Sequence, residues 1–172
     1  FRRGVFRSVT FRIEKQLSSL QTWSILKYAM ISHETNMFGS KKQENKRIGM
    51  IGEGIAARFL ENKGFTILER SLKYKFGEVD IIAKKRKNIH FVEVKSVRVS
   101  SSDGVSREKE SGGSGYRPEE LVHPEKIRKI KNVASVYMEN KAKGMDCQID
   151  VIAVFIDEER RVGKCRFNEN VT

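Results

Sequence analysis

Cysteine is nearly absent from this chain. Among its 172 residues only Cys147 and Cys165 occur, and neither belongs to a Cys-x-x-Cys pair or has closely spaced histidines nearby, so the sequence offers no zinc site of the usual spacing. Each cysteine falls inside an apparent strand. We therefore expect both to be buried free thiols in a protein from a reducing compartment.

Long apolar runs are missing as well. No segment approaches the roughly twenty apolar residues that a membrane-spanning helix requires, and no apolar core of a signal peptide is evident. We expect no membrane contact and a cytoplasmic location.

Acidic residues are few relative to basic ones. The chain has 34 Lys and Arg against 22 Asp and Glu, which gives a formal net charge of +12. A bias of this size favours polyanionic partners such as nucleic acid, although a solvated basic surface would have the same composition. The length suits one domain with tails, because two full domains would need a longer chain.

The N-terminal 43 residues differ from the rest of the chain. Residues 1–36 carry six basic and two acidic residues without a sharp amphipathic pattern, so a net charge of +8 remains on residues 37–172. We expect residues 1–43 to be a basic extension that is disordered or that derives from sequence upstream of the true start.

Residues 44–172 carry the periodic patterns of one domain. Apolar residues spaced three or four apart, beginning at Ile48, predict a helix over residues 44–64 that stops at Gly64. Pro124 at a first helical position, followed by an apolar stripe, predicts a second helix. Between the helices, residues 99–118 contain six serines and four glycines, which is typical of a flexible loop.

Segments rich in β-branched and aromatic residues predict five strands. They cover residues 65–72, 79–83, 89–97, 148–156 and 162–167. The polar run between the second and third of these suits a hairpin. The order of one helix, three strands, a helix and two strands predicts an α/β fold in which a central mixed β-sheet is flanked by helices.

A charged trio interrupts the apolar pattern of the two central strands. Residues two apart in a strand project to the same face, so Glu93 and Lys95 share one face of the predicted sheet. If the strands pair as a hairpin, Asp80 joins them there. A buried carboxylate is costly unless it is paired or bound to a cation, so this trio needs an explanation.

Two carboxylates on one patch suit a hard divalent cation such as Mg²⁺ or Mn²⁺, with water and phosphate oxygens as the remaining ligands. Asp80 and Glu93 would hold the cation, and Lys95 would orient the attacking water or neutralise charge on phosphorus. Glu53, at the edge of the core-facing stripe of the first helix, is a candidate for an extra ligand, direct or through water. The alternatives are a solvated strand face for Glu93 and Lys95, and a helix cap or ion pair for Glu53.

Several short motifs in order resemble the YraN-like family of bacterial proteins. They are Gly52-Glu53, Gly64-Phe65, the run from Gly77 to Ala83, and Phe91-Val92-Glu93-Val94-Lys95, and the resemblance covers roughly residues 44–157. That family is assigned to the restriction endonuclease-like fold of the PD-(D/E)xK nucleases. The resemblance departs in three places: Val79 stands where the motif has proline, Ser96 and Val97 precede Arg98, and the Ser/Gly-rich loop is long.

The resemblance implies roles for individual residues. Asp80 and Glu93 would be metal ligands, Lys95 the catalytic lysine and Glu53 the helix acid. Lys126 resembles the lysine that opens the family's second helix, and Asp150 resembles an acid in the following strand, for which a purely structural role is the alternative. Archaeal Holliday-junction resolvases have a similar arrangement and work as dimers, so branched DNA and a homodimer are compatible with the sequence.

The function that we expect is hydrolysis of phosphodiester bonds in DNA by a Mg²⁺-dependent endonuclease. Basic side chains would hold the phosphates through charge, namely Arg98, Lys126, Arg128, Lys129 and Lys131. The second hypothesis is a module on the same fold that binds nucleic acid or a protein partner without turnover. A third is a basic α/β protein with no role at nucleic acid.

Overall fold

The structure, a computed structural model, describes residues 7–12, 40–99 and 122–171. The predicted loop at 99–118 therefore lies, apart from Val99, outside the described residues. The elements follow in the order β1 (Arg7–Arg12), α2 (Lys41–Asn62), β2 (Thr66–Tyr74), β3 (Gly77–Lys85), β4 (Asn88–Arg98), α3 (Pro124–Lys141), β5 (Asp146–Asp157) and β6 (Val162–Asn168).

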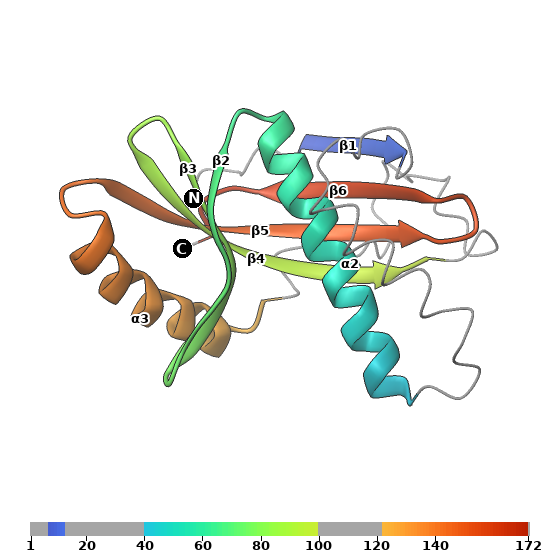
Figure 1. The fold of residues 1–172 in the computed structure, drawn as a ribbon, viewed down its shortest axis with the longest axis horizontal. Helices are drawn as coiled ribbons and strands as arrows, with labels where there is room; N and C mark the ends of the chain where they lie inside the picture. The colour runs from blue at the N-terminus through green and yellow to red at the C-terminus, as the bar shows by residue number, and fades with distance from the viewer. Residues whose placement is uncertain (1–6, 13–39, 100–121, 172) are drawn as a thin grey trace.

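The strands form one mixed sheet with the order β1-β6-β5-β4-β3-β2. Every neighbouring pair is antiparallel except β4 and β5, which run parallel and have α3 between them in the chain. The expected α/β fold, with a mixed sheet and flanking helices, is confirmed, and the arrangement is compatible with a restriction endonuclease-like fold (Figure 1).

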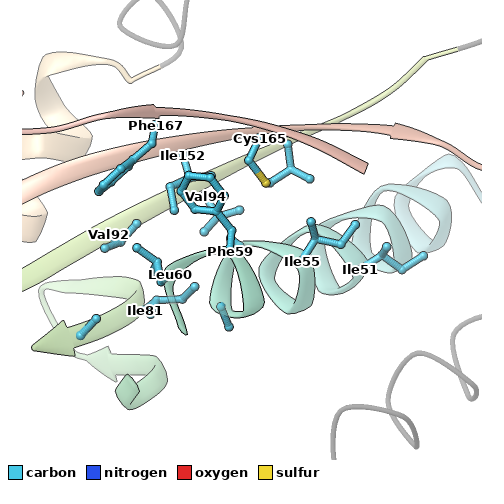
Figure 2. Close-up of a cluster of buried hydrophobic side chains, with 14 of the residues drawn as sticks. Ile51, Ile55, Phe59, Leu60, Ile81, Val92, Val94, Ile152, Cys165 and Phe167 are labelled. Atoms are coloured by element: carbon cyan, nitrogen blue, oxygen red, sulfur yellow. The ribbon is translucent and has the colours of Figure 1, made fainter. Parts of the chain in front are cut away.

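The two helices cover opposite faces of the sheet. Val92 and Val94 of β4 pack in the core under α2, while the alternate residue Phe91 packs under α3. Figure 2 shows the larger core, in which α2 places Ile51, Ile55, Phe59 and Leu60 against Val94, Ile152, Cys165 and Phe167. Each such side chain stabilises the fold by about 1.5 to 3 kcal/mol when it leaves water, so these two apolar faces fix where the strands lie.

Helix α2 has clear start and stop signals. The Ser40 side chain accepts a hydrogen bond from the Gln43 amide, and the Gln43 side chain accepts one from the Ser40 amide, which forms a capping box. Gly64 follows the helix with a φ of +79°, a conformation that a side chain disfavours. The predicted stop at Gly64 is confirmed, and the helix begins three residues earlier than expected.

Two expectations need correction. Residues 7–12 lie inside the extension that we expected to be either disordered or upstream sequence, and they form β1 and pair with β6, which contradicts disorder at these six residues. Cys165 is buried as expected, whereas Cys147 is exposed. The reason is that β6 pairs with β5 only from Val151 onward, so the first residues of β5, including Cys147, lack that neighbour.

One close contact sets the distance between α2 and β4. A Cβ atom on Gly52 would lie 1.7 Å from the Oγ and 2.7 Å from the Cβ of Ser96, and both distances are below any real contact. Only glycine lets the helix approach the strand this closely. The contact also fixes the height of the neighbouring Glu53 above the sheet.

We expect opposite effects from two glycine substitutions in α2. Gly52→Ala should lower the free energy of unfolding by about 1 to 3 kcal/mol, because the helix must move away from Ser96. Gly54→Ala should raise it by about 0.5 to 1 kcal/mol, since a Cβ there meets nothing within 4 Å and alanine is the better helix former. Urea unfolding of both variants measures this. Adding Ser96→Gly should restore much of the stability that Gly52→Ala loses; no rescue would show that the contact is not the cause.

No helix in the described part of the chain is long and apolar enough to cross a membrane.

Candidate active site

The sheet is irregular at Asp80. Regular pairing of β3 with β4 begins at the pair Lys85–Asn88 and ends at the pair Ile81–Val92. The amide of Val94, two residues further along, donates instead to Asp80 Oδ2 at 2.7 Å. The side chain of Asp80 thus takes the place of a backbone acceptor where the two strands separate.

The neighbouring strand is distorted at the same level. Ser71 of β2 lies between two regular pairs with β3 and has a φ of 49°, a left-handed conformation that is uncommon for serine. Val79 and Ile82, three residues apart, both pack in the core under α3, so the alternation of faces along β3 is broken around Asp80. This irregularity gives Asp80 its place beside Glu93.

Glu93 is the centre of the site. Its residue is 1% exposed, and its Oε1 lies 2.7 Å from the Nζ of Lys95. Its Oε2 lies 3.2 Å from the Nζ of Lys126, at the start of α3, but without hydrogen-bond geometry, so this buried oxygen accepts no hydrogen bond. A carboxylate that is almost fully buried is held here between two ammonium groups.

Asp80 and Glu93 act on each other as like charges. Burial, and then the charge of Glu93, raise the pKa of Asp80 to about 7, against the opposing effects of the Val94 amide and Lys126. Burial lowers the pKa of Lys126, but the charges of Glu93 and Asp80 outweigh it and leave that pKa above its ordinary value. Lys126 also lies 3.5 Å from Glu78 and lowers the pKa of that carboxyl. The acids and lysines therefore form one interacting group.

Glu53 interacts with Ser71 of β2 and affects this group through its charge. The Ser71 hydroxyl donates to its Oε2 at 3.1 Å, and its negative charge contributes to the raised pKa of Asp80. Across the described residues, no three Asp, Glu, His or Cys side chains gather closely enough to hold a metal ion. Asp80 and Glu93 are therefore a pair of carboxylates, and a role for Glu53 as a ligand stays a prediction.

The pair fits a hard divalent cation. Two carboxylates are the donor set through which proteins usually hold Mg²⁺, with water and substrate completing the shell. Glu93 Oε2 has the Lys126 ion pair but no hydrogen bond, and a cation would offset the charge of Glu93, which after burial is the main cause of the raised pKa of Asp80. Both observations favour Mg²⁺ or Mn²⁺ at this place.

The predicted phosphate contacts fall into two groups. Arg128, Lys129 and Lys131 are exposed on α3, where Lys129 pairs with Glu125 at 3.1 Å. Arg98 lies elsewhere, on the face that α2 covers, and its guanidinium contacts Glu158 at 3.0 Å and Glu44 at 3.4 Å. It belongs to an ion-pair network with Arg47, which contacts the same two acids. Nothing in this placement brings Arg98 to the carboxylate pair.

Asp150 is also separate from the site. Its Oδ2 lies 2.6 Å from His90 Nδ1, and its Oδ1 accepts from Gln148 Nε2 at 2.7 Å and from the Asn170 amide at 2.8 Å. It is fully buried and lies opposite Val92, on the face away from Glu93. The structural alternative describes Asp150 better than the catalytic one, and His90, its main partner, has no signal in the sequence that would have identified it.

The raised pKa of Asp80 has a consequence for stability. Between pH 3.8, the ordinary pKa of an aspartate, and about pH 7, Asp80 keeps its proton in the folded protein but loses it in the unfolded chain. The free energy of unfolding should therefore fall as pH rises through this window and stay level above it. Asp80→Asn should remove this slope. At pH 8 without metal the variant should be more stable than the parent by about 4 kcal/mol, since each pKa unit corresponds to about 1.4 kcal/mol, and near pH 4 the two should agree. Equal pH slopes in urea unfolding would contradict this.

A protein-family model and several known proteins match this chain over more than half of its length. The family model described as "Uncharacterised protein family UPF0102" matches residues 52–154, which include the whole stretch from Glu53 to Lys126. The chain belongs to this family. A UPF0102 protein of Caldanaerobacter subterraneus is 37% identical over 121 residues, covering 70% of this chain and 88% of the relative. A UPF0102 protein of Syntrophomonas wolfei is 34% identical over 125 residues, covering 72% and 94%. UPF0102 membership agrees with the YraN-like resemblance and leaves the activity open.

Proposed function

We propose that this UPF0102 protein is a metal-dependent endonuclease that hydrolyses phosphodiester bonds in DNA, in the cytoplasm. The observation that carries the proposal is the almost fully buried carboxylate of Glu93 between Lys95 and Lys126, beside Asp80 with its raised pKa. Perturbed acids with specific charged partners are typical of functional sites. A purely structural ion pair would not need a second acid whose ionisation the first one opposes.

Each residue has a distinct task in this proposal. Asp80 and Glu93 would hold Mg²⁺ or Mn²⁺, and Glu53 would support the ion through water. When bound, the cation lowers the pKa of a water molecule and offsets charge on the phosphate. The side chain of Lys95 is 35% exposed, so its ammonium can reach both Glu93 and a substrate, orient the attacking water and stabilise negative charge on the phosphate oxygens.

The basic face of α3 would hold the DNA. Arg128, Lys129 and Lys131 are exposed, and cations on one face bind the phosphate backbone without reading bases. Lys126 begins the same helix and reaches the carboxylates, so the helix would connect the backbone contacts to the place of cleavage. This charge-based binding should weaken steeply as salt rises.

One observation favours the second hypothesis, a binding module without turnover. Lys126 and Lys95 both form ion pairs with Glu93, as they would in a cluster with a purely structural role. The two hypotheses share the predicted DNA binding and differ only in cleavage.

Incubation with labelled linear, flapped and four-way DNA tests the proposal. We expect cleavage with Mg²⁺ or Mn²⁺ and none with EDTA. Salt-sensitive binding without cleavage of any substrate would replace the enzyme with the binding module. A protein that fails to bind DNA at low salt would overturn both.

A further inference from the structure

The turn between β2 and β3 presents an exposed phenylalanine. Residues 73–76, which we call the aromatic tip, read Lys-Tyr-Lys-Phe. Phe76 is 42% exposed, and only two other large hydrophobic residues in the described part of the chain, Met50 and Leu68, reach a similar exposure. Lys73 and Lys75 on either side of Tyr74 are exposed as well. Alternating basic and aromatic residues therefore occupy the end of this hairpin.

The Phe76 ring is held in a fixed orientation. It stacks on Tyr74 with ring centroids 5.4 Å apart and an interplanar angle of 2°. Tyr74 in turn packs against the core under α3. One face of Phe76 thus rests on an anchored ring, which lowers the entropy that it would lose on binding a second flat group.

The aromatic tip lies beside the candidate site. Gly77, directly after Phe76, packs so closely on α3 that a Cβ there would lie 2.9 Å from the Lys129 carbonyl oxygen. Glu78, the next residue, contacts both Lys73 of the tip and Lys126 of the site at 3.5 Å. Figure 1 shows the β2–β3 hairpin reaching past the sheet next to the first turns of α3.

We propose that the aromatic tip binds an unpaired base of a DNA strand, with Phe76 stacked on the base and Lys73 and Lys75 on the flanking phosphates. Every nucleobase offers a flat face to an aromatic ring, and such stacking contributes about 1 to 3 kcal/mol per base. In a continuous duplex these faces are covered by neighbouring base pairs. The tip therefore selects DNA with single-stranded or branched segments over intact duplex.

This inference takes from the proposed function only that the DNA backbone lies along α3 and the carboxylate pair. The basic flanks favour a polyanion over a second copy of this chain, because two copies would bring Lys73 and Lys75 against the same lysines. Binding, not cleavage, is what the tip determines.

Phe76→Ala tests the inference, with Leu68→Ala as the matched control. Leu68 lies on the same hairpin with 40% exposure and has no aromatic partner in the described structure. Fluorescence anisotropy without divalent metal would measure binding of single-stranded, flapped and duplex DNA of equal length. Phe76→Ala should weaken binding to the first two about tenfold and to duplex less than twofold, whereas Leu68→Ala should change none of them, and Phe76→Trp should keep the preference.

Equal losses on duplex and single strands, or no loss at all, would overturn the inference. So would a change from dimer to monomer on gel filtration of Phe76→Ala, which would make the tip a contact between copies. Because binding is measured without metal, a parent protein that prefers unpaired DNA but never cleaves it would sink the proposed enzyme and leave the inference intact. If the parent cleaves DNA and Phe76→Ala keeps the same preference for unpaired DNA, the proposed enzyme stands and the inference fails.

Discussion

Replacing Glu93 with glutamine is expected to reduce metal-dependent DNA cleavage at least a hundredfold, with little change in DNA binding at low salt. The substitution keeps the shape of the side chain but removes the charge that faces Lys95 and Lys126, and it replaces one of the two carboxylates for the cation with a neutral amide oxygen. Removing a single group that stabilises developing charge typically costs about 10² to 10³ in rate. Single-turnover cleavage of labelled DNA measures the loss.

Lys95→Met should give a loss of similar size for a different reason. The carboxylate pair would remain able to hold the cation, so Mn²⁺ affinity measured by calorimetry should survive in Lys95→Met and fall in Glu93→Gln. Lys84→Met is the matched control, since Lys84 is an exposed lysine on β3 to which neither the proposed chemistry nor the proposed DNA contacts assign a role. If Glu93→Gln and Lys95→Met both cleave as well as the parent, the site is assigned wrongly.

Asp150→Asn is expected to destabilise the protein by about 3 to 5 kcal/mol, because it breaks a buried hydrogen-bond network and leaves more than one donor without an acceptor. The carboxylate is fully buried and accepts from the Gln148 side chain and the Asn170 amide besides contacting His90. The asparagine side chain would instead direct an N–H group toward groups that are themselves hydrogen-bond donors. For a chain of this size each kcal/mol corresponds to about 2 to 4 °C in the melting temperature, so the variant should melt roughly 6 to 20 °C lower.

Asp146→Asn provides the comparison on the same strand. Asp146 is exposed at the start of β5, and surface substitutions of this kind usually stay within about 0.5 kcal/mol. Folded Asp150→Asn should retain DNA cleavage, because Asp150 lies on the face opposite Glu93. A variant that melts like the parent but no longer cleaves would show instead that Asp150 takes part in the chemistry.

The sequence predicts those features of the site that depend on local periodicity. Glu93 and Lys95 share a face because strand residues alternate, and their contact at 2.7 Å agrees with this. The apolar stripe of α2 and the stop at Gly64 follow from helical spacing in the same way. Patterns of this kind depend on only a few neighbouring residues, so they can be recognised without knowledge of the tertiary fold.

Contacts between distant residues could not be predicted in this way. Lys126 reaches Glu93 across 33 positions of sequence. The sequence predicts a phosphate contact for Lys126, and nothing in the local pattern indicates this ion pair. Arg98 follows Lys95 by an odd number of residues, which sends it to the opposite face and into the network of Glu44 and Glu158. Ser71, which helps to displace Asp80 from regular pairing, has a left-handed backbone conformation. Glycine and asparagine are the residues that usually indicate this conformation in a sequence, and a serine does not.

The parallel pairing of β4 with β5 also determines when the site can form during folding. The neighbouring hairpins β2–β3 and β3–β4 join segments close in sequence, whereas β5 meets β4 only after the chain has crossed over through α3. Non-local pairings of this kind close late, because the entropy of the intervening loop is lost before the contacts form. Glu93 lies in the strand before that crossover and Lys126 lies in the first turn of its helix, so their ion pair forms only when α3 packs on the sheet.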